Sequence, residues 1–128
     1  MKLYSSFVVA TLIGDVVGSR RAADRDLVHA ALTARLEAVN TELAPLAPLR
    51  ITVGDEFQGA FATLGDALAT TLRLRLALAP EIEVRFGVGW GDVRVLQDEP
   101  RVEDGAGWWA ARAAIEAVET AQARAGSR

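Results

Sequence analysis

Two aspartates, each preceded by a glycine, have the residue type and the setting for metal and phosphate chemistry. Asp15 follows the apolar run Phe7 to Ile13, and Asp55 lies in the short turn Gly54-Asp55-Glu56-Phe57. Two carboxylates that face each other in a partly buried site repel, and a divalent cation relieves the repulsion. Mg²⁺ takes oxygen ligands, and a pair of such ions can activate an attacking oxygen and stabilise a leaving one. We therefore predict that Asp15 and Asp55 hold two Mg²⁺ or Mn²⁺ ions.

The residues after Asp15 have the composition of a phosphate-binding turn. Backbone N–H groups in a glycine-containing turn can face anionic oxygens, and an arginine can add charge-assisted hydrogen bonds. A helix beginning near Asp24 would contribute its positive N-terminal end if that end points the same way. The residues that we predict to bind phosphate are Val16, Val17, Gly18, Ser19 and Arg20.

The elements that must position these side chains follow from the spacing of apolar residues and from the breakers between them. Leu64 to Leu78 is ambiguous, because Leu72 to Leu76 alternates like a strand, but its length and its Ala and Leu content favour a helix. Gly89 to Asp92 is expected to be a turn, and Gln97 to Gly105 a polar loop. The regular elements are strands over Phe7–Ile13, Arg50–Val53, Gln58–Phe61, Ile82–Val88 and Val93–Leu96, and helices over Asp24 to about Thr41, Leu64–Leu78 and Trp108 to about Ala125.

This order predicts an α+β, ferredoxin-like palm, which is a βαββαβ core followed by an extra strand and a C-terminal helix. We expect an antiparallel sheet with its helices on one face. The first and third strands are then central neighbours, so the end of the first strand and the adjoining hairpin meet there. A Gly-Asp pair alone is a common turn, but the meeting of two such pairs favours a site.

Composition limits the other possibilities. The chain has 128 residues, of which 51% are apolar, and these numbers indicate one domain over residues 1–128. With no cysteine and a net charge of −3, it has no disulfide framework, and direct nucleic-acid binding through bulk charge is not expected. No apolar run approaches the about 20 residues of a membrane span, so we expect a cytoplasmic protein. An Ala-rich C-terminal helix without a further capping element is compatible with an N-terminal fragment of a longer protein.

Four segments in the same order resemble the motifs of class III nucleotide cyclases. They are Ile13–Ser19, Val53–Asp55, Val84–Val93 and Ala110–Arg112. The run Gly54-Asp55-Glu56-Phe57 also resembles the hairpin of GGDEF diguanylate cyclases, which share this palm. The resemblance implies that Asp15 and Asp55 are metal ligands, that Glu56 supports the metal or accepts a proton, and that Arg112 stabilises the transition state.

A narrower resemblance is to the SatD family. It rests on Ile13 to Arg20, Gly54 to Gly59, Arg85 to Gly91 and Asp104 to Arg112, and it spans residues 7 to about 118. The name of that family is linked to acid tolerance in bacteria, which implies a bacterial protein. Members often look longer than this chain, with a C-terminal part that resembles a helix-turn-helix.

The chain departs from the cyclase pattern at two positions. Trp108 stands where cyclases have an asparagine four residues before the arginine, and Ile51 stands where they have a purine-reading lysine. These departures put cyclisation and adenine recognition in doubt. In class III cyclases the site lies between two subunits, so the resemblance also implies a homodimer in which Arg112 acts in trans.

Three functions therefore share one predicted fold. The first is a metal-dependent enzyme that binds a nucleoside triphosphate or another nucleotide and transfers a nucleotidyl group. The second is a catalytically degenerate sensor that reports nucleotide binding to an attached C-terminal region, which could bind DNA. The third is a homodimerisation module. The single histidine, His29, has no predicted role.

Overall fold

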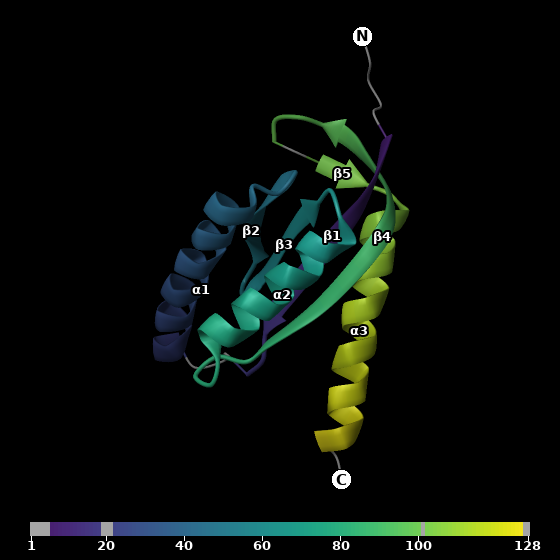
Figure 1. Ribbon diagram of the computed structural model, residues 1–128. Helices are drawn as coiled ribbons and strands as arrows, with labels where there is room; N and C mark the ends of the chain where they lie inside the picture. Colours follow the sequence, from purple (N-terminus) through teal and green to yellow (C-terminus); the bar gives the residue numbers. More distant parts are fainter. Residues whose placement is uncertain (1–5, 19–21, 101, 127–128) are drawn as a thin grey trace.

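The computed structural model describes residues 6–18, 22–100 and 102–126, so Ser19 and Arg20 of the predicted phosphate-binding turn lie outside the described residues. Five strands and three helices alternate along this part of the chain (Figure 1). In chain order they are β1 (Ser6–Val16), α1 (Ala22–Leu43), β2 (Ala47–Val53), β3 (Glu56–Phe61), α2 (Leu64–Leu78), β4 (Val84–Gln97), β5 (Val102–Asp104) and α3 (Ala106–Gly126).

The described strands form one antiparallel sheet in the order β2-β3-β1-β4-β5. β1 is central and pairs with β3 on one side and β4 on the other, as the sequence predicted for its first and third strands. The predicted helix over Leu64–Leu78 is confirmed to the residue. Thr63 caps its N-terminus, because the Thr63 hydroxyl accepts from the Asp66 amide at 3.0 Å.

The predicted turn over Gly89 to Asp92 is wrong. β4 runs without interruption from Val84 to Gln97 and pairs with β1 from Val84 opposite Val16 to Arg94 opposite Ser6. Its glycines serve close packing rather than a turn. A Cβ atom on Gly89 would lie 2.4 Å from the Gly107 carbonyl oxygen and 2.5 Å from the Ala111 nitrogen, both in α3. The predicted loop over Gln97 to Gly105 likewise contains β5.

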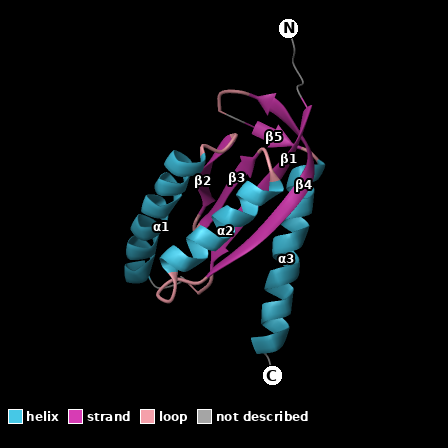
Figure 2. Cartoon of the chain, in the orientation of Figure 1, coloured by secondary structure: helices cyan, strands magenta, loops and turns pink. Residues whose placement is uncertain are grey.

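The helices cover both faces of the sheet, which corrects the expectation of helices on one face. α1 and α2 lie on one side and α3 on the other (Figures 1 and 2). Successive residues of β1 divide between the two layers, as the two-residue period of a strand requires. Leu12 belongs to the large core under α1 and α2, whereas Ile13 packs against Ala111 and Ile115 of α3.

A buried threonine fastens α3 to the middle of the sheet. The Thr11 hydroxyl lies 2.7 Å from the Gly107 carbonyl oxygen of α3 and 3.3 Å from the Gly89 carbonyl oxygen of β4. This contact and the glycine packing fix the height at which α3 crosses β1 and β4. None of the helices in the described part of the chain has the length and hydropathy needed to cross a membrane.

Candidate functional site

Asp15 and Asp55 line one cavity at the end of β1, although 40 residues separate them in the sequence. The cavity has a volume of about 730 Å³ and is bounded by β1, the first turns of α1, the β2–β3 hairpin tip and β4. Its lining residues are Asp15, Val16, Gly18, Arg25, Asp26, Val28, His29, Leu32, Gly54, Asp55 and Arg85.

Strand register brings the hairpin tip to this place. Gly14 lies opposite Phe57 in the β1–β3 pair, so the tip two residues before Phe57 lies beside the end of β1. The pair is close, because a Cβ atom on Gly14 would come within 2.2 Å of the Phe57 ring. The register therefore explains why two aspartates remote in sequence share one cavity.

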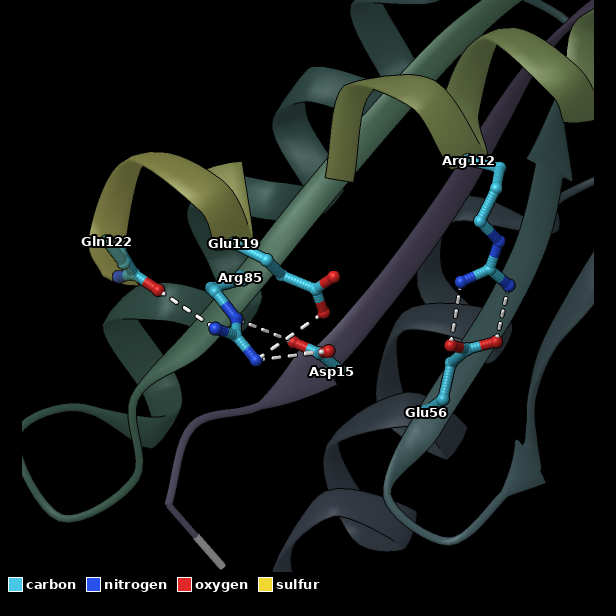
Figure 3. Close-up of polar contacts among 6 residues, drawn as sticks. All are labelled: Asp15, Glu56, Arg85, Arg112, Glu119 and Gln122. Carbon is cyan, nitrogen blue, oxygen red and sulfur yellow. Dashed lines mark hydrogen bonds and ion pairs between the residues drawn. The ribbon is translucent and has the colours of Figure 1, made fainter. Parts of the chain in front are cut away.

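The Asp15 carboxylate is held by an arginine that sequence reasoning did not single out. Arg85 lies opposite Asp15 in the β1–β4 register. Its Nε donates to Asp15 Oδ1 at 3.0 Å and its Nη2 to Oδ2 at 3.3 Å, so both carboxylate oxygens accept (Figure 3). The same guanidinium donates to Gln122 Oε1 at 3.1 Å and lies 3.5 Å from Glu119 Oε2, both on α3.

The charges in this cluster perturb one another. The hydrogen bond to Asp15 raises the pKa of Arg85, against the opposing effect of burial, and the attraction of Asp15 and Glu119 adds to the rise. The pKa of Glu119 is also raised, first by its hydrogen bond with Asp15, then by burial and by repulsion from Asp15, while Arg85 lowers it. Two carboxylates thus share one guanidinium.

A second arginine–carboxylate pair joins α3 to the hairpin. Arg112 donates from Nη1 to Glu56 Oε1 at 3.0 Å and from Nη2 to Oε2 at 2.7 Å (Figure 3). This bidentate bond raises the pKa of Arg112. Arg112 thus contacts the hairpin of its own chain, next to Asp55 in sequence.

Arg112 lines a second cavity, of about 490 Å³, and not the cavity of Asp15 and Asp55. Both indoles at the start of α3 are hydrogen-bonded there: Trp108 Nε1 donates to Glu103 at 3.0 Å and Trp109 Nε1 to Asp104 at 3.1 Å. The lining residues are Ile13, Ala47, Pro48, Arg50, Gln58, Gly59, Glu103, Trp108, Trp109 and Arg112.

The described residues of the predicted phosphate-binding turn are not all available to a ligand in the cavity. Val16 and Gly18 line the cavity, but the Val17 amide donates to the Glu83 carbonyl oxygen at 2.9 Å and is already paired. Gly18 and Gly54 have positive φ angles of 77° and 58°. A Cβ atom on either glycine would meet no atom within 4 Å, so both turns border open space.

As arranged here, the residues do not fit the predicted two-metal site. Both oxygens of Asp15 accept from Arg85, whose positive charge would repel a metal ion bound to the same carboxylate. Over residues 6–18, 22–100 and 102–126, no three His, Cys, Asp or Glu side chains are grouped so that they could hold a metal ion. The prediction of Mg²⁺ or Mn²⁺ at Asp15 and Asp55 stays a prediction, and it requires Arg85 to move.

Sequence reasoning gave no role to four polar side chains that line the cavity with Asp15 and Asp55, which are Arg25, Asp26, His29 and Arg85. Arg85 was within a predicted strand, and only the pairing register shows that it lies opposite Asp15. Arg25 and His29 lie in the first turns of α1. Their helical spacing was visible in the sequence, but the cavity that they line was not.

The fold is that of the class III nucleotide cyclase palm. The chain resembles the crystal structure of the guanylyl cyclase Cya2 at 15% identity and a TM-score of 0.72, over 90% of this chain and 72% of that one. It resembles the catalytic core of a rhodopsin-guanylyl cyclase with converted specificity, solved with ATPαS, at 16% identity and a TM-score of 0.71, over 88% and 74%. An adenylate/guanylate cyclase/hydrolase from Silicibacter pomeroyi matches at 23% identity and a TM-score of 0.63, over 84% and 68%.

Within this fold the sequence identifies a particular family. The family model of the SatD family matches residues 9–126, which is nearly the whole chain. The chain belongs to the SatD family, as its motifs predicted. A comparison with curated proteins finds no match.

Proposed function

We propose that this SatD-family domain binds a nucleotide, with the phosphates in the cavity that Asp15 and Asp55 line. The observation that carries the proposal is the meeting of both predicted acids and both open glycine turns at one cavity. The volume of about 730 Å³ lies within the range of small-molecule sites.

Arg25 is the side chain of the cavity that best supports an anionic ligand, because a guanidinium matches phosphate oxygens well and Arg85 is already bonded to Asp15. Asp15, Asp26 and Asp55 line the same cavity, so phosphate binding would depend on local donors and not on the net charge of the lining. α1 contributes Arg25 and His29 to the same lining, within its first three turns. The solved cyclase core with ATPαS shows that a palm of this fold can hold a nucleotide analogue.

Sensing is the second candidate, and two departures from the cyclase pattern favour it over cyclisation. Trp108 packs against buried residues of the sheet and of α3, and its indole N–H is bonded to Glu103, so it offers no amide in place of the missing asparagine. Ile51 packs against the large core and provides no lysine. Nucleotidyl transfer by Asp15, Asp55, Glu56 and Arg112 stays a prediction.

A homodimer is the assembly that we propose for this site. Arg112 lines a different cavity from Asp15 and Asp55 in its own chain, and a partner subunit would bring a second Arg112 to the cavity of the aspartates. Trp109, with 64% of its surface exposed, lies beside Arg112 on that side and is suited to an interface.

Thermal unfolding with a panel of nucleoside triphosphates, with Mg²⁺, Mn²⁺ or EDTA, tests the proposal on three proteins. We expect a rise of several degrees in Tm for the wild type at ligand concentrations about 100-fold above Kd. Asp55→Asn should reduce the rise, whereas Asp98→Asn, which alters an exposed aspartate outside the cavity, should retain it. No shift for any nucleotide would contradict the proposal.

Product analysis then separates the enzyme from the sensor. A nucleotide that binds and is recovered unchanged supports sensing. Turnover that falls at least tenfold in both Asp55→Asn and Arg112→Ala supports nucleotidyl chemistry instead.

A further inference from the structure

The cation that neutralises Asp15 is part of the protein. Three acceptors from two elements converge on the Arg85 guanidinium, namely Asp15 from β1 and Glu119 and Gln122 from α3 (Figure 3). Guanidinium donors form a planar fork that matches a carboxylate bidentately, and both Asp15 oxygens lie within 3.3 Å of that fork. Arg85 is therefore the counter-ion of the Asp15 carboxylate.

We infer that Arg85 is the resident cation of the Asp15 site and excludes a divalent metal ion from that carboxylate. A metal bound to Asp15 would place its charge beside the guanidinium, and like charges this close repel strongly where water is scarce. The Asp15 and Arg85 side chains are only 14% and 20% exposed, so little solvent screens that repulsion.

Side chains of α3 hold Arg85 beside Asp15. Glu119 and Gln122 contact its guanidinium, and the charge of Glu83 attracts it as well. α3 itself is fixed on β4 by the glycine packing and by Thr11. Removing the guanidinium while keeping Asp15 and Glu119 would leave two carboxylates close together without a counter-ion, which is the arrangement that attracts a divalent cation.

Electron paramagnetic resonance of free Mn²⁺, without any nucleotide, tests the inference directly. The wild type should leave the Mn²⁺ signal unchanged at concentrations where Arg85→Gln removes it, with at least a tenfold difference in affinity. Adding Asp15→Asn to Arg85→Gln should abolish the gained binding. Arg94→Gln, which alters an exposed arginine of the same strand, should behave like the wild type.

Two further variants keep the test decisive if Arg85→Gln folds poorly. Arg85→Lys retains a positive charge and should exclude Mn²⁺ as the wild type does. Mn²⁺ binding by the wild type that is lost in Asp15→Asn would overturn the inference, as would a folded Arg85→Gln that gains no affinity. Because no nucleotide is present, either result leaves the proposal of nucleotide binding to be judged separately.

Discussion

The two arginine–carboxylate pairs beneath α3 have the same chemistry but different surroundings. Both are bidentate, and both join residues at least 56 positions apart. In the Asp15–Arg85 pair the side chains are 14% and 20% exposed, whereas in the Glu56–Arg112 pair they are 25% and 44% exposed. Arg85 also has two further acceptors on α3.

The difference indicates that hydrogen-bond geometry alone does not determine how much an ion pair contributes to the free energy of unfolding. A solvent-exposed pair gains little, because water and salt screen it and its side chains lose entropy. Breaking a shielded pair is costly, because the remaining charge is left without a partner or full hydration. We therefore expect Arg85 to support the fold, and Arg112 to remain able to exchange Glu56 for another anion.

The largest effect should come from moving α3, which would disrupt both pairs together. Gly89→Ala places a Cβ atom 2.4 Å and 2.5 Å from backbone atoms of α3, so the helix must shift. We expect a loss of about 3 kcal/mol in the free energy of unfolding, the upper part of the range for overpacking. Urea denaturation measures it.

Gly65→Ala is the matched control for that substitution. The nearest atom to a Cβ on Gly65 is Thr63 Oγ1 at 3.9 Å, an ordinary contact, and Gly65 lies within α2. Alanine should therefore stabilise the protein, by about 0.5–1 kcal/mol. Equal destabilisation by the two alanines would contradict the role given to the α3–β4 contact.

The next effect separates the two pairs. Arg85→Gln should lower the free energy of unfolding by about 2 kcal/mol, less than the 3–5 kcal/mol for a fully buried pair, because Asp15 keeps some access to water. Arg112→Gln should cost less than about 1 kcal/mol. Chemical denaturation of both variants under the same conditions measures these losses in the free energy of unfolding. A larger loss for Arg112→Gln than for Arg85→Gln would contradict the prediction.

Double-mutant cycles isolate the interaction energy within each arginine–carboxylate pair. We expect a coupling energy of about 1–2 kcal/mol for Asp15→Asn with Arg85→Gln, since the residues are in contact and partly shielded. For Glu56→Gln with Arg112→Gln we expect about 0.5 kcal/mol or less. Indistinguishable couplings would show that the difference in exposure has no energetic consequence.

The sequence predicted the βαββαβ order, the hairpin at Asp55 and the helix over Leu64–Leu78, because apolar spacing and turn residues are local signals. It failed at Gly89-Trp90-Gly91-Asp92, where the glycines make room for α3, a reason that lies 18 residues further along the chain. The role of Arg85 also depends on contacts between residues remote in sequence, so it could not be predicted. The residue type was visible, but its place opposite Asp15 depends on the register between two strands 70 residues apart.

The smallest predicted effect is the dependence of the two couplings on salt. At about 1 M salt the screening length falls to about 3 Å, comparable to the separation of charges in an exposed pair. The Glu56–Arg112 coupling should then vanish, because solvent ions reach Arg112. The Asp15–Arg85 coupling should keep more than half of its value, since the α3 side chains limit the access of ions to it. Repeating both cycles in 0.05 M and 1 M NaCl measures this, and a parallel loss of the two couplings would mean that the Asp15 site is open to solvent ions and, by the same path, to a metal.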